Sequence, residues 1–132
     1  ADEHEKLGYR SILNFGHTIG HAIEVAASYK KSISHGEAVC VGMLCAFDIA
    51  VSTGMAKEKS AARIEALIKR AKLPVSVRGI DPRKVLKAAL YDKKIVMGKR
   101  RWVLPCDIGH VVVCTHVPGD IIKQAVLKRV RP

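Results

Sequence analysis

Two histidines four residues apart form the part of the sequence best suited to binding a metal ion. His17 and His21 would project from one face of an α-helix, one turn apart. His35 follows one loop later and could turn back toward this helix. Catalytic zinc usually takes three protein ligands and leaves a fourth position open. From the residues alone, these three histidines could supply all three ligands, although the same histidine spacing also occurs in helices that bind no metal.

Glycines accompany the histidines. Gly16 and Gly20 each directly precede a histidine, and Gly36 directly follows His35. A glycine inside a helix costs about 1 kcal/mol relative to alanine. We therefore expect the backbone at Gly16 and Gly20 to approach another group closely.

A second set of polar residues extends this pattern toward the N-terminus. Counting in steps of three and four places Arg10, Asn14, His17 and His21 on one face of a single continuous helix. An arginine can bind a carboxylate or a phosphate through two parallel hydrogen bonds. The face predicts the wall of a polar pocket, and a solvent-exposed helix face is the alternative.

The elements that would position these residues are mainly helical. Apolar residues at helical spacing and turn residues between them predict five helices and a β-hairpin in one domain covering residues 1–132. The apolar residues of the second helix surround it, so we expect that helix to be buried on every side. Asp81 and Pro82 provide the N-cap and first position of the fourth helix. The helices are predicted over 11–27, 36–52, 57–71, 82–91 and 121–130, and the hairpin near 101–117.

The charge of the chain is divided unevenly. The 132 residues contain 23 Lys and Arg against 12 Asp and Glu, a net charge of +11. Residues 1–66 have a net charge of −1 and residues 67–132 a net charge of +12. Such a basic half could indicate a nucleic-acid-binding module. However, the chain is only 5% aromatic and its basic residues are scattered over several elements, so we expect no nucleic-acid partner.

Composition also bears on the location of the protein. The longest apolar run, Ala38–Val51, contains Asp48 and is expected to be too short to span a bilayer. The N-terminus does not have the form of a signal peptide. The four cysteines show no CxxC pairing, which favours free thiols in a reducing compartment. We expect a cytoplasmic protein without a membrane segment, and the acidic start Asp2–Glu5 suggests a piece of a longer polypeptide.

Three segments resemble a known family. LNFGHTIGHAIE at 13–24, SHGEAVCVGM at 34–43 and DKK at 92–94 are similar to the C-terminal domain of 3-dehydroquinate synthases. The resemblance covers the whole chain and is densest from Arg10 to Met43. It implies the helical C-terminal domain of that fold. It also implies a lyase of the shikimate pathway that converts 3-deoxy-arabino-heptulosonate 7-phosphate to 3-dehydroquinate and phosphate, using NAD and a divalent metal, usually zinc and alternatively cobalt.

The resemblance implies a role for each matching residue. His17 and His35 match zinc ligands, although the loop over 28–34 is slightly longer than is common in the family. The third ligand of the family is a glutamate on the preceding NAD-binding domain, which this chain lacks. His21 matches a histidine that contacts the substrate phosphate rather than the metal, which revises the three-histidine interpretation. The remaining matches are a carboxylate-binding arginine, a substrate-binding asparagine and a phosphate-contacting lysine: Arg10, Asn14 and Lys93.

The resemblance also sets limits on the chain alone. No GxGxxG motif or dinucleotide-binding βαβ unit occurs in it. We therefore expect the isolated chain to be inactive and to hold zinc weakly, whereas the full-length enzyme is expected to be a homodimer. The closest alternative is another sugar phosphate cyclase that makes an inosose or valiolone ring, for which Arg10 is the discriminating residue. A metal-dependent polyol dehydrogenase domain and a catalytically silent homologue are further alternatives.

Overall fold

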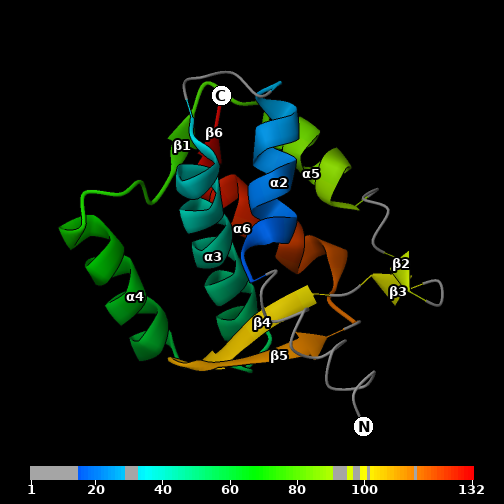
Figure 1. Cartoon of the computed structure of the whole chain (residues 1–132). Coiled ribbons are helices and arrows are strands. Elements are labelled where there is room, and N and C mark those ends of the chain that lie inside the picture. Colours follow the sequence, from blue (N-terminus) through cyan, green and yellow to red (C-terminus); the bar gives the residue numbers. More distant parts are fainter. Residues whose placement is uncertain (1–14, 29–32, 91–94, 97–98, 101, 115) are drawn as a thin grey trace, which may run out of the picture.

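A buried helix, α3 (His35–Ser52), lies at the centre of the fold (Figure 1). The computed structural model describes residues 15–28, 33–90, 95–96, 99–100, 102–114 and 116–132. Four elements pack against α3: α2 (His17–Ala26), α4 (Glu58–Arg70), β4 (Trp102–Asp107) and α6 (Gly119–Arg129). A further helix, α5 (Pro82–Leu90), packs against α2 and α6. The mainly helical fold and the buried central helix predicted from the sequence are confirmed.

The start of α3 is fixed by a capping box. The backbone N–H of Glu37 donates to Ser34 Oγ at 3.1 Å, and the backbone N–H of Ser34 donates to Glu37 Oε1 at 2.9 Å. The hydrogen bonds from Ser34, its backbone N–H first, lower the pKa of the Glu37 carboxyl. This reciprocal pair satisfies two N–H groups that the helix leaves unpaired. His35 is therefore held as the first residue of α3.

By length and composition alone, the 18 residues of α3 are long and apolar enough to cross a membrane, although the shorter run Ala38–Val51 within it was expected to be too short. Among the described helices it is the only one with this property. Half of these residues are buried inside the fold, against the helices and the strand that surround α3. A core helix of a folded domain passes the same test, and packing accounts for the apolar composition here.

Helices α2 and α3 lie side by side (Figure 1) and meet through glycines. A Cβ atom on Gly42 of α3 would overlap the carbonyl oxygen of Gly16, and it would come within 2.7 Å of the Gly20 nitrogen. A Cβ on Gly20 would in turn lie 3.1 Å from the carbonyl oxygen of Ala38. The close approach expected at Gly16 and Gly20 is therefore made to the backbone of α3.

The predicted hairpin is confirmed. Strand β4 pairs antiparallel with β5 (His110–Cys114), from Trp102 opposite Cys114 to Asp107 opposite His110, with a bulge between Pro105 and Asp107. Two shorter pairs were not predicted. β1 (Val77–Arg78) pairs in parallel with β6 (Val130–Arg131), and β2 (Ile95–Val96) pairs antiparallel with β3 (Lys99–Arg100).

The helix boundaries agree with the sequence except at the first helix. Helices α3, α4, α5 and α6 begin and end within two residues of the predicted positions. The predicted cap of α5 is also present, because the backbone N–H of Arg83 donates to Asp81 Oδ1 at 2.9 Å. In the described part of the chain α2 begins at His17, after Gly16, and the predicted start near residue 11 lies outside the described residues.

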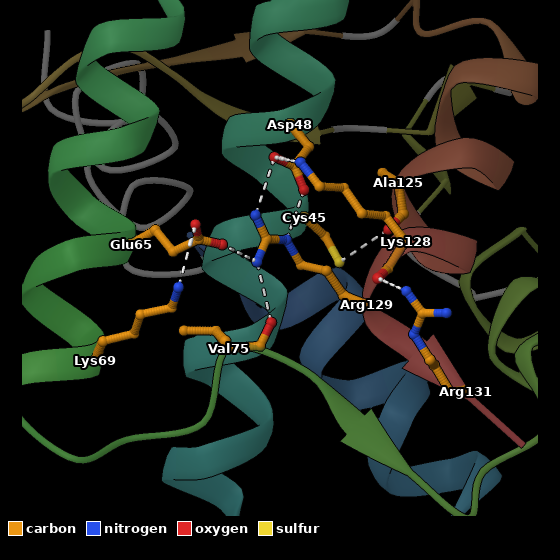
Figure 2. A network of polar contacts seen from close by, with 9 residues as sticks. All are labelled: Cys45, Asp48, Glu65, Lys69, Val75, Ala125, Lys128, Arg129 and Arg131. Atoms are coloured by element: carbon orange, nitrogen blue, oxygen red, sulfur yellow. Dashed lines mark hydrogen bonds and ion pairs between the residues drawn. The ribbon is translucent and has the colours of Figure 1, made fainter.

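One buried arginine connects three helices (Figure 2). Arg129, at the end of α6, is only 5% exposed. Its Nε donates to Asp48 Oδ2 on α3 at 2.6 Å, and one terminal nitrogen donates to Glu65 Oε1 on α4 at 2.7 Å and to the Val75 carbonyl at 3.0 Å. Burial opposes the charge of Arg129, but its hydrogen bonds to the two carboxylates outweigh burial and raise its pKa.

Candidate metal and substrate site

The structure places three of the six predicted site residues. His17 is the first residue of α2 and is half-buried, and His21 lies one turn further along the helix and is exposed. His35 is the first residue of α3 and its side chain is exposed. Arg10, Asn14 and Lys93 lie outside the residues that the structure describes.

His17 and His35 come together although 18 positions separate them in the sequence. Their ring centroids lie 5.5 Å apart, with an angle of 56° between the ring planes. Two imidazoles that bind one tetrahedral zinc ion through nitrogens at about 2.0–2.1 Å have ring centres about 5 Å apart. The observed separation of the two rings therefore fits a shared divalent metal ion.

The hydrogen bonds of the two rings determine which nitrogen could bind the metal. His17 Nδ1 lies 3.2 Å from the Phe15 carbonyl oxygen, and His35 Nδ1 lies 2.8 Å from Glu24 Oε1. A carbonyl and a carboxylate can only accept, so in both rings the proton sits on Nδ1 and is donated. In a neutral imidazole this leaves the Nε2 lone pair available to a metal. Both histidines therefore have the donor atom that a zinc or cobalt site requires.

The interpretation with three histidines on one metal is not supported. Within the described residues, no group of three His, Cys, Asp or Glu side chains is arranged to hold a metal ion. His21 lies on the same face of α2 as His17, and the two rings that the described residues place against each other are those of His17 and His35. This pair is the one that the family resemblance implies.

The predicted stripe along one continuous helix is wrong at Gly16. This residue has φ +79°, in the left-handed region, and forms the N-cap of α2. The backbone turns there, which brings the Phe15 carbonyl back onto His17 Nδ1. Because the helix does not continue through this turn, helical spacing does not place Arg10 and Asn14 on the face of His17 and His21. The polar pocket wall stays a prediction, because Arg10 and Asn14 lie outside the described residues.

Glu24 is a polar neighbour of the histidines that the sequence analysis did not single out. It lies on α2, seven residues after His17, and its side chain is 14% exposed. Positions i, i+4 and i+7 share one helix face, so His17, His21 and Glu24 line the same side of α2. This spacing was the signal in the sequence that could have identified Glu24.

A separate cleft of about 310 Å³ lies between α3, α4 and α6, beside Arg129. Its lining includes Asp48, Glu58, Glu65 and Lys128 but none of the three histidines. The cleft is therefore distinct from the histidine pair, and its charged residues belong mainly to the ion-pair network around Arg129.

The fold and the paired histidines define a helical domain of the sugar phosphate cyclase type. A 2-epi-5-epi-valiolone synthase from Streptomyces hygroscopicus, solved with NAD⁺ and Zn²⁺ bound, matches 87% of this chain with a TM-score of 0.76 and 29% identity. A 2-deoxy-scyllo-inosose synthase, solved with carbaglucose-6-phosphate, NAD⁺ and Co²⁺, matches 88% with a TM-score of 0.70 and 25% identity. Residues 1–95 match the family described as 3-dehydroquinate synthase C-terminal. The chain belongs to this family.

Relatives in sequence agree with this assignment. The 3-dehydroquinate synthase of Nostoc punctiforme is 47% identical over 118 residues, which cover 89% of this chain and 32% of the relative. The enzyme of the same name from Thermoanaerobacter sp. is 44% identical over 92% of this chain and 34% of the relative. The chain therefore spans about a third of the length of the curated relatives that it matches.

Proposed function

We propose that this chain is the metal- and substrate-binding part of a 3-dehydroquinate synthase. In this reaction, 3-deoxy-arabino-heptulosonate 7-phosphate becomes 3-dehydroquinate and inorganic phosphate. The observation that carries the proposal is the pair His17 and His35, with rings 5.5 Å apart and both Nδ1 atoms bound to acceptors, in a chain of this family. The remaining two thirds found in the relatives would supply the NAD-binding domain and a third metal ligand.

His17 and His35 would hold the divalent metal, zinc or cobalt. The metals present in the two structural neighbours support this choice. When bound, the metal would polarise a substrate hydroxyl as a Lewis acid, and NAD would accept a hydride from the carbon that bears this hydroxyl. The hydrogen bonds at Nδ1 would stop the two rings from rotating freely, so each Nε2 lone pair would keep a fixed direction.

The other predicted residues would bind the substrate. His21, one turn from His17 on the same face of α2, would contact the phosphate together with Asn14 and Lys93. These groups would hold the phosphate in place and balance its charge while it leaves. Arg10 would bind the carboxylate at the opposite end of the substrate through two hydrogen bonds.

The remaining parts of the proposal concern the whole enzyme. We place it in the cytoplasm as a homodimer with no nucleic-acid partner. The isolated chain would form no 3-dehydroquinate and would hold zinc only weakly, because two protein ligands are fewer than a catalytic zinc site uses. Dehydroquinate formation by the chain alone would contradict this part, and so would sub-micromolar zinc affinity that is lost when His17 or His35 is replaced.

A hybrid enzyme tests the proposed reaction. In this hybrid, the chain replaces the matching third of the Nostoc punctiforme relative. We expect NAD- and metal-dependent release of phosphate and formation of 3-dehydroquinate, with the intact relative as the positive control and the His17→Ala hybrid as the inactive control. A folded hybrid that binds NAD and metal but does not convert this substrate would overturn the proposal.

A second candidate activity is ring formation by another sugar phosphate cyclase. The similarity in fold to the valiolone and inosose synthases favours this alternative. The sequence relatives favour 3-dehydroquinate synthase, with 47% identity against 29%. Assays of the hybrid with a carboxylate-bearing heptulosonate phosphate and with carboxylate-free sugar phosphates separate the two activities. Arg10 is expected to matter only for the first substrate.

A further inference from the structure

We propose that Glu24 is a positioning residue for the metal site. Its carboxylate holds the ring of His35 in the tautomer and orientation that leave Nε2 free for a metal ion. The inference rests on the proposed function, because it assigns a partner to one of the two proposed metal ligands. It adds a residue of this chain whose role is to act through His35 rather than to touch the metal or the substrate.

The hydrogen bond between Glu24 and His35 is short, and the Glu24 side chain is much more buried than that of His35. Glu24 Oε1 lies 2.8 Å from His35 Nδ1, which is within the range of a strong charge-assisted hydrogen bond. The Glu24 side chain is 14% exposed, whereas the His35 side chain is 64% exposed. Packing therefore holds the carboxylate in place far more than the ring. The hydrogen bond from His35 to Glu24 is what fixes the orientation of an otherwise exposed imidazole.

The location of Glu24 is unfavourable for a carboxylate that has no partner. It lies near the end of α2, where the helix dipole presents partial negative charge. Among the described residues, His35 is the only hydrogen-bond or ion-pair partner of its side chain. The interaction with His35 therefore accounts for a carboxylate at this end of the helix.

Close contacts hold helices α2 and α3, which carry Glu24 and His35, against each other. Gly20 on α2 lies against α3, because a Cβ on it would come within 3.1 Å of the Ala38 carbonyl oxygen and of Val39 Cα. The capping box between Ser34 and Glu37 fixes the first turn of α3. Because these contacts do not involve the Glu24 side chain, we expect a change at Glu24 to act on the ring of His35 rather than on the packing of α2 against α3.

The two proposed ligands differ in how they are oriented. His17 donates to the Phe15 carbonyl, a backbone group that no side-chain substitution removes, whereas His35 donates to a side chain. Carboxylate partners of metal-bound histidines fix the tautomer and raise the basicity of the ligand, and their loss typically weakens metal binding by about 10- to 100-fold. A substitution at Glu24 should therefore remove the hydrogen bond that orients His35 and leave the hydrogen bond of His17 in place.

The test compares three substitutions in the hybrid enzyme. Glu24→Ala removes the acceptor, and Glu24→Gln keeps an oxygen that can accept from Nδ1 but removes the charge. Glu58→Gln removes a carboxylate on α4, outside the histidine pair, and is the matched control. Zinc affinity is measured by competition with a chelator, and the tautomer of His35 by NMR of ¹⁵N-labelled histidine in the metal-free protein.

We expect zinc binding about 10- to 100-fold weaker in Glu24→Ala, an intermediate loss in Glu24→Gln and none in Glu58→Gln. The Nε2–H tautomer of His35 should become populated in Glu24→Ala while that of His17 stays unchanged. Unchanged zinc affinity together with an unchanged tautomer in Glu24→Ala would overturn the inference. A parent hybrid that binds no zinc would instead overturn the proposed function, and the tautomer measurement would still decide whether Glu24 positions His35.

Discussion

Arg129 Nε lies 2.6 Å from Asp48 Oδ2, and this contact joins the last helix to the central helix across 81 positions of the sequence. The guanidinium is almost fully buried; Glu65 and the Val75 carbonyl accept from one terminal nitrogen, and Asp48 Oδ1 accepts from the other. A buried charge is tolerated only where hydrogen bonds and opposite charges replace water. Arg129 therefore acts as a structural connection between α3, α4 and α6, and it is not available to a polyanion.

Removing Arg129 should destabilise the chain strongly. Arg129→Met leaves Asp48 and Glu65 without their main partner, and breaking a buried ion pair in this way costs about 3–5 kcal/mol of the free energy of unfolding. Lys128, whose Nζ lies 3.5 Å from Asp48 Oδ1, should reduce the loss. Urea denaturation measures the change, with exposed Arg131→Met as the control, expected within about 0.5 kcal/mol of the unsubstituted chain. Equal effects of the two substitutions would contradict the structural role.

The partner carboxylate Glu65 should make stability dependent on pH. The hydrogen bond from Arg129 lowers the pKa of Glu65 below its ordinary value, so the folded state favours the ionised form. The resulting stabilisation is present above the pKa of the unfolded chain and is lost as the pH falls through the lower folded pKa. The difference in free energy of unfolding between the unsubstituted chain and Glu65→Gln should therefore shrink between pH 6 and pH 3. A difference that is constant over this range would argue against the coupling.

Local patterns predicted the helices well because each pattern is contained in a short segment. The all-apolar run of α3, the amphipathic spacing of α4 and the Asp81–Pro82 start of α5 all depend on neighbours within a few residues. The β1–β6 pair could not be predicted in this way. It joins Val77 to Val130 through strands of two residues, which are too short to show a period.

The candidate site was predictable in part for the same reason. Helical spacing and the family motif identified His17, His21 and His35. The turn at Gly16 was missed because a glycine is compatible with a helix and with a left-handed residue alike. Arg129 appeared in the sequence as one charge in a basic tail, since nothing local indicates that its partners lie 81 and 64 positions away. Burial of a charge is decided by tertiary contacts.

The glycine contact between α2 and α3 should tolerate no side chain at Gly42. A Cβ there overlaps the Gly16 carbonyl oxygen, so Gly42→Ala must separate the two helices. We expect a loss of about 1–3 kcal/mol in the free energy of unfolding, as for other overpacked sites. Gly36→Ala on the same helix is the control, because nothing lies within 4 Å of its added Cβ. Its stability should be unchanged or slightly higher. A neutral Gly42→Ala would show that the helices can move apart freely.

Cys45 should be inert toward thiol reagents in the folded chain. Burial raises the pKa of its thiol to about 12, and its Sγ lies 3.7 Å from the Ala125 carbonyl oxygen. Since the thiolate is the reactive form, almost none is present at pH 8. Labelling at pH 8 followed by peptide mass spectrometry should find Cys45 unmodified until urea unfolds the chain, when it should react at an ordinary rate. Partly exposed Cys106 should be labelled before unfolding and serves as the internal control.

The three site histidines should separate into two functional groups in the hybrid enzyme. His17→Ala and His35→Ala each remove a proposed metal ligand and should abolish tight zinc binding together with activity. His21→Ala should keep its zinc, because the two proposed ligand rings that lie together are His17 and His35, and it should lower kcat/KM by roughly 10- to 1,000-fold through weaker contact with the phosphate. Zinc content by atomic absorption and steady-state kinetics on the same preparations distinguish the groups. Loss of zinc from the His21→Ala hybrid would return this residue to the metal site and would refute the assignment to phosphate.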